Sequence, residues 1–319
     1  MLPFRSGVAI VALFVSGLPL RPPASQSASS RAIASPPFLL AWSGWKSALV
    51  PIGRYTGDTW VNTWPEPNEG NVPVPAIESV PFAWLSKPVP RQWTLFLEGR
   101  PTRITVTSTR RGAPDSLCTS PAVLSIDRPP SIRDDAYDGG LAVDNNQIVE
   151  DVRRLTPADA QWRVVAPVAE RTYAQYESRA LGAGDQTWFT DALVRGRIDL
   201  ATKPMVVDAI YQAVTDISAP TFYFVATKRF VVENREYGVV VSGWLRPDVG
   251  GRWPAMAVAT RTFGGDITGD GLRPLGLLRV LARRFWVMFA PGWESGGFEL
   301  YEATGTDMLR LLTSSNGAC

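Results

Sequence analysis

The closing part of the chain carries a group of residues that could bind a sugar: Trp286, Trp293 and Tyr301, with Glu294 beside Trp293. Aromatic faces and acids are typical of glycan sites, and glycoside hydrolysis uses two carboxylates at a set separation. We therefore consider these four residues a candidate ligand-binding patch. The alternative is that the aromatic residues belong to the core, since large aromatic side chains chiefly serve packing. The sequence pairs no second acid with Glu294.

A second group has the residue types of a calcium loop. Asp266, Thr268 and Asp270 supply oxygen ligands at loop positions one, three and five, and a glycine that permits a sharp turn follows. This motif resembles the calcium loops of EF-hands and of FG-GAP repeats, and the resemblance implies calcium as the ligand. It departs from them at Pro274, where such repeats place a further acid, and at Leu277, where an EF-hand has its bidentate glutamate. Those departures favour a hairpin loop without metal, so we expect no cofactor, with calcium as the alternative.

The absence of histidine removes several classes of enzyme. With no histidine in 319 residues, Ser-His-Asp and Cys-His systems and histidine-liganded zinc sites are excluded. The chain has 32 basic and 30 acidic residues, a net charge of +2, and no basic block, so we expect no nucleic-acid partner. We therefore expect a protein without catalytic activity, while chemistries that need no histidine stay open.

The two cysteines, Cys118 and Cys319, form an even pair, and the default for such a pair in an oxidising compartment is a disulfide. This bond would tie the C-terminus to the first half of the chain. Closing a loop of about 200 residues would stabilise the fold by about 5 kcal/mol at most on the chain-entropy model. The alternative is two independent thiols.

The N-terminus predicts export. Residues 1–20 contain Arg5 ahead of a short apolar run that ends at Pro19, which is the pattern of a signal peptide. The run is short for a bilayer span, which favours a signal peptide. The alternative is an uncleaved anchor, and we expect no other contact with a membrane. Residues 21–38 are rich in Ser, Ala and Pro and predict a flexible linker. We expect a secreted or periplasmic protein whose partner is unknown, with a glycan or another envelope component as the candidate.

Residues 39–127 predict a small β-rich domain. The segments with the composition and alternation of strands are 47–52, 59–64, 93–98, 103–109 and 122–127. Seven prolines between residues 65 and 90 cannot donate to a sheet ladder and predict an extended wrap over the surface. The polar stretch 128–147, with several aspartates, is expected to be an inter-domain loop.

Residues 148–319 predict a helix followed by a β-meander. Thr156 and Pro157 are typical of a helix start and Gly182 of its end. Pro167 predicts a kink or a restart between them. The strand segments that follow are 205–214, 221–232, 237–245, 255–263, 275–281, 285–289, 298–303 and 308–312. Because such short returns permit only antiparallel neighbours, we expect an α+β fold, mostly antiparallel β, in which one kinked helix packs on a C-terminal meander of about eight strands.

As a whole, the chain resembles uncharacterised secreted β-rich proteins of bacteria. The resemblance lies in the proline segment WPEP at 64–67, the sequence KPVPRQW at 87–93 and a closing hairpin with Trp, Gly and Glu. It implies export and brings no known activity. Our leading hypothesis is an exported non-enzymatic protein, structural or binding. The competing hypotheses are a glycan-binding or glycan-cleaving protein that uses Trp286, Trp293 and Glu294, and a calcium-stabilised adhesion module built on residues 266–271.

Overall fold

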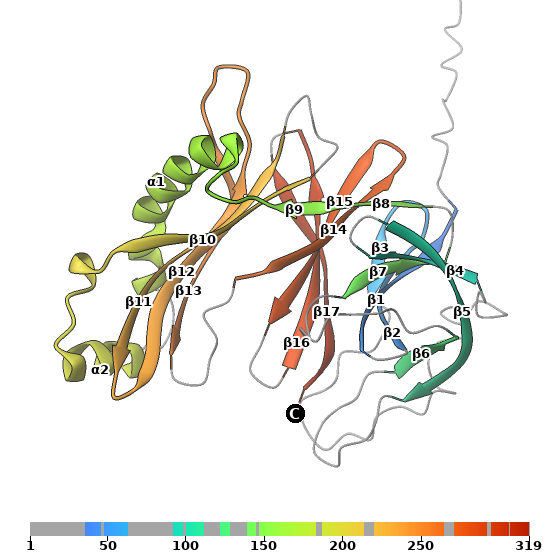
Figure 1. The fold of residues 1–319 in the computed structure, drawn as a ribbon, viewed down its shortest axis with the longest axis horizontal. Coiled ribbons are helices and arrows are strands. Elements are labelled where there is room, and N and C mark those ends of the chain that lie inside the picture. Colours follow the sequence, from blue (N-terminus) through green and yellow to red (C-terminus); the bar gives the residue numbers. More distant parts are fainter. Residues whose placement is uncertain are drawn as a thin grey trace, which may run out of the picture. The chain divides into compact units, whose positions relative to one another are not determined.

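The computed structural model describes residues 36–45, 48–62, 92–97, 100–111, 122–127, 139–144, 147–182, 187–213, 220–264, 271–291, 295–305 and 307–318. Their fold is α+β and mostly antiparallel β-sheet (Figure 1). The predicted signal segment 1–20 and nearly all of the predicted linker 21–38 lie outside the described residues.

The strands of the N-terminal half form one sheet that closes on itself. They are β1 (Phe38–Trp45), β2 (Ala48–Tyr55), β3 (Trp60–Asn62), β4 (Gln92–Leu97), β5 (Arg100–Arg111), β6 (Ala122–Ile126) and β7 (Gly140–Val143). Their order is β1-β7-β4-β5-β6-β2-β3, and β1 also pairs with β2. The ring β1-β7-β4-β5-β6-β2 is therefore a closed barrel, and β3 extends from β2. Closure removes the open strand edges that would otherwise pair with other chains.

Alternation along the strands separates the inside of the barrel from its outside. In β1, Leu39 and Ala41 belong to the interior, whereas Leu40 and Trp42 belong to a different apolar cluster on the outside. The interior is filled by buried apolar side chains: Leu39, Ala41, Leu49, Trp93, Leu95, Ile104, Val106, Leu124, Ile126 and Ala142. The barrel is thus a packed core in its own right.

The C-terminal half forms two meanders. β10 (Met205–Ala213), β11 (Phe222–Val232), β12 (Arg235–Leu245) and β13 (Ala255–Gly264), together with β9 (Val152–Arg154), form the sheet that we call the helix-covered sheet. β14 (Arg273–Val280), β15 (Arg283–Pro291), β16 (Ser295–Ala303) and β17 (Met308–Ala318), together with β8 (Ile148–Glu150), form the central sheet. β8 and β9 are separated only by Asp151, so one stretch of chain supplies an edge strand to each sheet.

Helices cover one face of the helix-covered sheet. They are α1 (Ala160–Gly182), α2 (Thr187–Gly196) and the short 3-10 helix η2 (Leu200–Thr202), and Figure 1 shows α1 and α2 on the same side of β10–β13. α1 continues through Pro167 and does not restart there. It begins at Ala160, later than predicted, because the Asp159 carboxylate accepts the Thr156 N–H at 2.7 Å and closes a turn before the helix.

Apolar layers join these sheets into one compact unit, Ser35–Cys319. The second face of the helix-covered sheet packs against the central sheet in what we call the inter-sheet layer, made of the buried residues Ala209, Ala213, Tyr223, Val225, Val240, Trp244, Met256, Phe263, Leu277, Trp286, Met288, Tyr301 and Met308. The opposite face of the central sheet packs against the outside of the barrel. Because the central sheet is buried on both faces, residues 285–289 of β15 are apolar without alternation.

The structure confirms the predicted fold class, α+β and mostly antiparallel β, and shows how the strands are distributed between sheets. All eight segments predicted after residue 204 are strands, but they belong to two sheets rather than to one meander. The predicted inter-domain loop 128–147 contains β7, which inserts between β1 and β4. A strand of four residues, GLAV, is too short to show a period. α2 was not predicted, since it follows a Gly-rich stretch of sequence and buries only Phe189 and Ala192.

Asp144 follows β7 and lies against β1. Its Oδ1 accepts the N–H of Leu39 at 2.8 Å, and its own N–H donates to the Leu39 carbonyl at 3.4 Å. Burial raises the pKa of Asp144 to about 6, although the Leu39 N–H and the Arg54 guanidinium act to lower it. The folded state therefore holds a proton on this carboxyl more readily than the unfolded chain does.

Asp144→Asn is expected to remove a pH dependence of stability. Because the pKa of Asp144 is raised in the folded state, its contribution to the free energy of unfolding is largest below about pH 4. That contribution is lost as the pH rises through about 6. The asparagine keeps an oxygen for the Leu39 N–H and does not ionise. Above pH 6 the variant should be more stable than the wild type by about 1–3 kcal/mol, and the difference should shrink towards pH 4. Urea unfolding from pH 4 to 8 measures this, and a pH-independent difference would contradict the assignment.

Candidate functional site

The structure places two of the four residues of the predicted sugar patch in the core. Trp286 on β15 and Tyr301 on β16 are cross-strand partners and are 1% and 8% exposed. Both belong to the inter-sheet layer. Trp293 and Glu294 lie outside the described residues. The described half of the patch therefore packs two sheets together and presents no open aromatic face to a sugar.

The other predicted site residues lie outside the described residues. These are Asp266, Thr268 and Asp270 of the calcium loop, and Cys118 and Cys319 of the disulfide. Within the described ranges, no group of three or more Asp, Glu, His or Cys side chains is arranged to hold a metal ion. The polar groups inside and beside the described sheets supply the remaining candidates for a site.

The inter-sheet layer holds polar groups within its aromatic packing. Trp244 on β12 lies between the sheets, with its ring centroid 4.9 Å from that of Tyr223 and 4.4 Å from that of Tyr301. The Tyr301 hydroxyl donates to Glu299 on the same strand, and Glu299 lies 3.7 Å from Nη1 of Arg310. A line of aromatic rings thus joins the two sheets, and a charged pair stands at its end.

The Trp244 indole N–H has no hydrogen-bond partner among the described residues, whereas the Tyr223 hydroxyl has the Ser242 hydroxyl beside it. Tyr223 and Trp244 are 0% and 1% exposed and stand opposite each other on β11 and β12. Burial raises the pKa of Tyr223, and the nearby Ser242 hydroxyl and Arg261 guanidinium oppose that rise only in part. Tyr223 therefore stays protonated, and its hydroxyl remains a donor.

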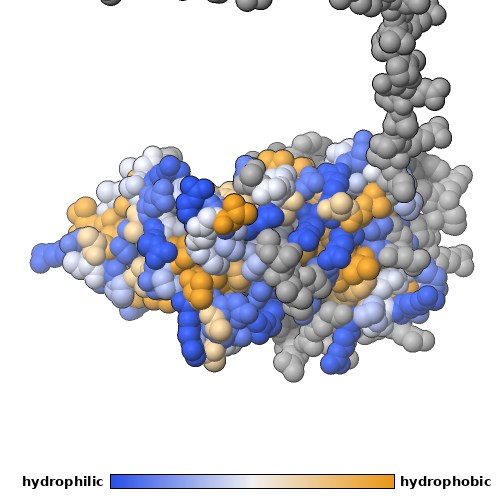
Figure 2. Space-filling view, turned by 90° about the horizontal axis from the view of Figure 1, so that it is seen from above, coloured by the Kyte–Doolittle hydropathy of each residue, from blue (hydrophilic) through white to orange (hydrophobic). Residues whose placement is uncertain are grey.

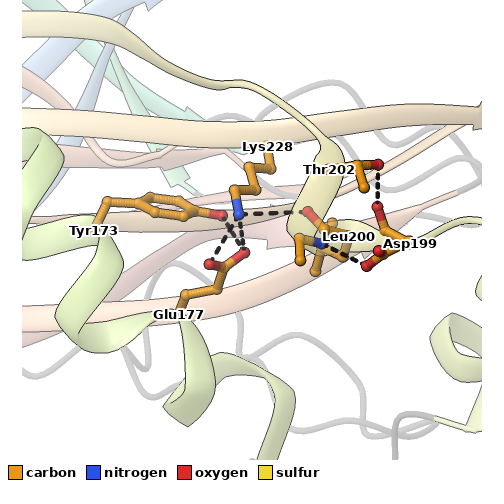
Figure 3. Close-up of polar contacts among 7 residues, drawn as sticks. Tyr173, Glu177, Asp199, Leu200, Thr202 and Lys228 are labelled. Atoms are coloured by element: carbon orange, nitrogen blue, oxygen red, sulfur yellow. Dashed lines mark hydrogen bonds and ion pairs between the residues drawn. The ribbon is translucent and has the colours of Figure 1, made fainter.

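On the opposite face of the same sheet, Tyr173, Glu177 and Lys228 form a polar cluster under α1 (Figure 3). Lys228 Nζ donates to Glu177 Oε2 at 3.0 Å and to the Leu200 carbonyl at 3.4 Å. The Tyr173 hydroxyl donates to Glu177 Oε1 at 3.5 Å. One lysine on β11 thereby ties both α1 and η2 to the sheet.

This cluster has the residue types of an acid–base pair without the electrostatics of one. A tyrosine serves as a base near neutral pH only if its pKa falls, as a neighbouring cation can cause. Here burial and the negative charge of Glu177 raise the pKa of Tyr173, and only a backbone hydrogen bond of Lys228 acts to lower it. The phenol stays protonated, so the cluster acts as a clamp between helix and sheet.

A third charged group links the central sheet to the barrel. Arg283, at the start of β15, donates from Nε to Glu302 Oε1 at 2.6 Å and from Nη2 to Oε2 at 2.8 Å. Its Nη1 donates to the Tyr55 hydroxyl at 3.3 Å and also to the Asp58 carbonyl. The hydrogen bonds that Arg283 donates to Glu302 raise the pKa of Arg283, which keeps this two-bond ion pair charged. The pair therefore fixes the β14–β15 hairpin against the loop that joins β2 and β3.

The surface offers separate apolar groups. Figure 2 shows hydrophobic side chains dispersed among hydrophilic ones on the face that it draws. Exposed apolar residues come from several elements, among them Val194 on α2, Val206 on β10 and Val231 on β11. No helix in the described part of the chain is both long enough and apolar enough for a membrane span. The buried donors of the inter-sheet layer are the more specific feature.

Sequence reasoning missed Tyr223 and Trp244. The alternation in segment 221–232 predicts one buried face, that of Phe222 and Phe224, and assigns Tyr223 to the other. The structure buries both faces, because the central sheet covers the second one. The sequence signal that could have revealed this is in residues 237–245 of β12, where apolar and small residues follow one another without a two-residue alternation.

Trp286→Ala tests whether this indole packs the core or serves a ligand. We expect a loss of about 3–5 kcal/mol in the free energy of unfolding, because a fully buried aromatic side chain leaves a large cavity. Trp188→Ala is the matched control, since Trp188 on α2 is 37% exposed and should lose less. Guanidinium unfolding measures both. An equal, small loss in the two variants would contradict the packing role.

Comparisons with known proteins assign no family to this chain. No protein-family model matches it. No curated protein and no solved structure matches it either. The case for a function therefore rests on the residues of the chain itself.

Proposed function

We propose that this chain is an exported, non-enzymatic protein with a binding or structural role, in the periplasm or outside the cell. The observation that supports this is the use of its aromatic residues. Trp244, Trp286 and Tyr301 pack against one another in a buried layer between two sheets, with ring centroids 6.4 Å apart for the two tryptophans. Residues that could have lined an open site instead hold the sheets together.

The described charged pairs support the same proposal. Lys228 pairs with Glu177 at 2.9 Å and Arg283 pairs with Glu302 at 2.6 Å, and each pair joins elements that are distant in sequence or on different strands. An ion pair stabilises one protonation state of each partner. Side chains engaged in this way are poorly suited to exchange protons with a substrate, and they do suit a chain that must keep its shape.

The two alternatives depend on residues other than these. A glycan site would have to use Trp293 and Glu294 without Trp286 and Tyr301, because the latter two are buried. A calcium-stabilised adhesion module would have to use Asp266, Thr268 and Asp270 as its ligands. No contact of a described residue favours either alternative, so the non-enzymatic role is the one that we retain.

One set of assays separates these proposals. The purified full chain is expected to release no reducing sugar from a panel of polysaccharides, because Trp286 and Tyr301, which could have bound a sugar, are buried. Its thermal unfolding midpoint is expected to be the same in EDTA and in excess calcium. Turnover of any polysaccharide would contradict the non-enzymatic role. A midpoint that rises with calcium in the wild type and not in Asp266→Asn would support the adhesion module instead.

A further inference from the structure

We propose that the outer edge of β13 pairs with β13 of a second copy of this chain, antiparallel and about a two-fold axis. Two helix-covered sheets would thereby join into one continuous sheet. The inference goes beyond the function proposed above, because it concerns what the chain assembles with. Its basis is a long sheet edge with which no described strand pairs.

β13 is the last strand at one end of the helix-covered sheet. β12 pairs with it on one side, and no strand in the described part of the chain pairs with it on the other. β13 has ten residues, whereas the outer strands β9, β8 and β3 have three each. The remaining outer strand, β17, contacts β2 and β3 of the barrel. An edge as long as that of β13 presents a row of backbone N–H and C=O groups to which another strand can bind.

This edge carries few of the features that keep natural sheet edges from pairing. Those features are charged side chains, prolines, bulges and short length. A bulge lies at the start of β13, where Ala257 has a φ of 44° and the register with β12 shifts. From Ala259 to Gly264 the register is regular, and Arg261 is the one charged residue of the strand. The part of β13 that follows the bulge is therefore open to pairing.

The long segments of this chain outside the described residues are poor partners for such an edge. Residues 63–91 contain seven prolines, which lack the N–H that a sheet ladder needs. Residues 21–35 begin with Arg-Pro-Pro and hold a single β-branched residue, Ile33, so their tendency to form a strand is low. The strand that this chain can best supply to the edge is a second β13.

β13 is compatible with a copy of itself. Antiparallel pairing about a two-fold axis uses the same surface of both copies, so the assembly closes as a dimer. A register centred on Arg261 would place two guanidinium groups opposite each other, which is unfavourable. A register centred on Thr260 instead places Arg261 opposite Ala259 of the other copy. It also pairs Thr262 with Val258, and β-branched residues are well suited to neighbouring strands.

An aromatic side chain lies at the end of this edge. Trp188 on α2 packs over Gly264, where an added Cβ would lie 2.8 Å from the indole ring. The Trp188 side chain is nevertheless 37% exposed. Tryptophan is enriched among the residues that contribute most to protein interfaces. Trp188 therefore offers apolar surface to a second copy at the position where β13 ends.

Thr260→Lys tests the pairing, because the expected register brings the two added charges together at its centre. Sedimentation equilibrium should show the purified full chain as a dimer at micromolar concentration. The dissociation constant of the dimer should be higher in the variant by about tenfold or more. Thr107→Lys is the matched control, since Thr107 is exposed on β5 of the barrel, and it should dimerise as the wild type does.

Hydrogen exchange of the unsubstituted chain locates the interface independently of any variant. Amides of residues 258–262 that point away from β12 should exchange about tenfold more slowly or less in the dimer than in the diluted monomer. Amides of β4 should exchange equally in both. The proposal is overturned if the full chain is monomeric at millimolar concentration, or if folded Thr260→Lys dimerises as tightly as the wild type. It is also overturned if dimerisation leaves the exchange of residues 258–262 unchanged.

Discussion

Burial of the central sheet on both of its faces is the constraint on which the rest of the structure depends. One face of β14–β17 packs against the barrel and the other packs against the helix-covered sheet. Each of the flanking sheets also has an apolar layer of its own, inside the barrel or beneath α1 and α2. The middle of the central sheet shows no solvent face in this arrangement, so its strand β15 has to be apolar on both faces, whereas β16 and β17 also carry charged residues such as Glu299 and Arg310. This is what the run 285–289 provides.

Several features of the fold can be predicted from sequence patterns, and others cannot. The eight C-terminal strands are long and bounded by turn residues, so their existence and antiparallel pairing could be predicted. Their division between two sheets could not, because alternation reports which residues share a face and says nothing of which sheet a strand joins. β7 is too short to show a clear alternation of apolar and polar residues. It completes the barrel by pairing with β1 and β4, which are far from it in sequence.

The burial of single side chains in the candidate site could not be predicted from sequence patterns either. Trp286 and Tyr301 could be recognised as aromatic residues on neighbouring strands, but their burial depends on the helix-covered sheet, which comes earlier in the chain. Tyr223 lies on what alternation predicts to be the less buried face of β11, and the central sheet covers that face. Residues with clear chemical capacity, such as the Tyr173, Glu177 and Lys228 cluster, serve to hold elements together. The Trp244 indole N–H, which has no hydrogen-bond partner among the described residues, departs from this pattern.

Hydrogen exchange of the amides of residues 285–289 tests the central claim most directly. If β15 is the shared layer of one cooperative unit, these amides should exchange only when the whole unit unfolds, with protection equal to the global free energy of unfolding. Amides of β4 and β5 in the barrel should show protection no higher than this value. Exchange of β15 through local openings, at a free energy several kcal/mol below the global value, would contradict the claim.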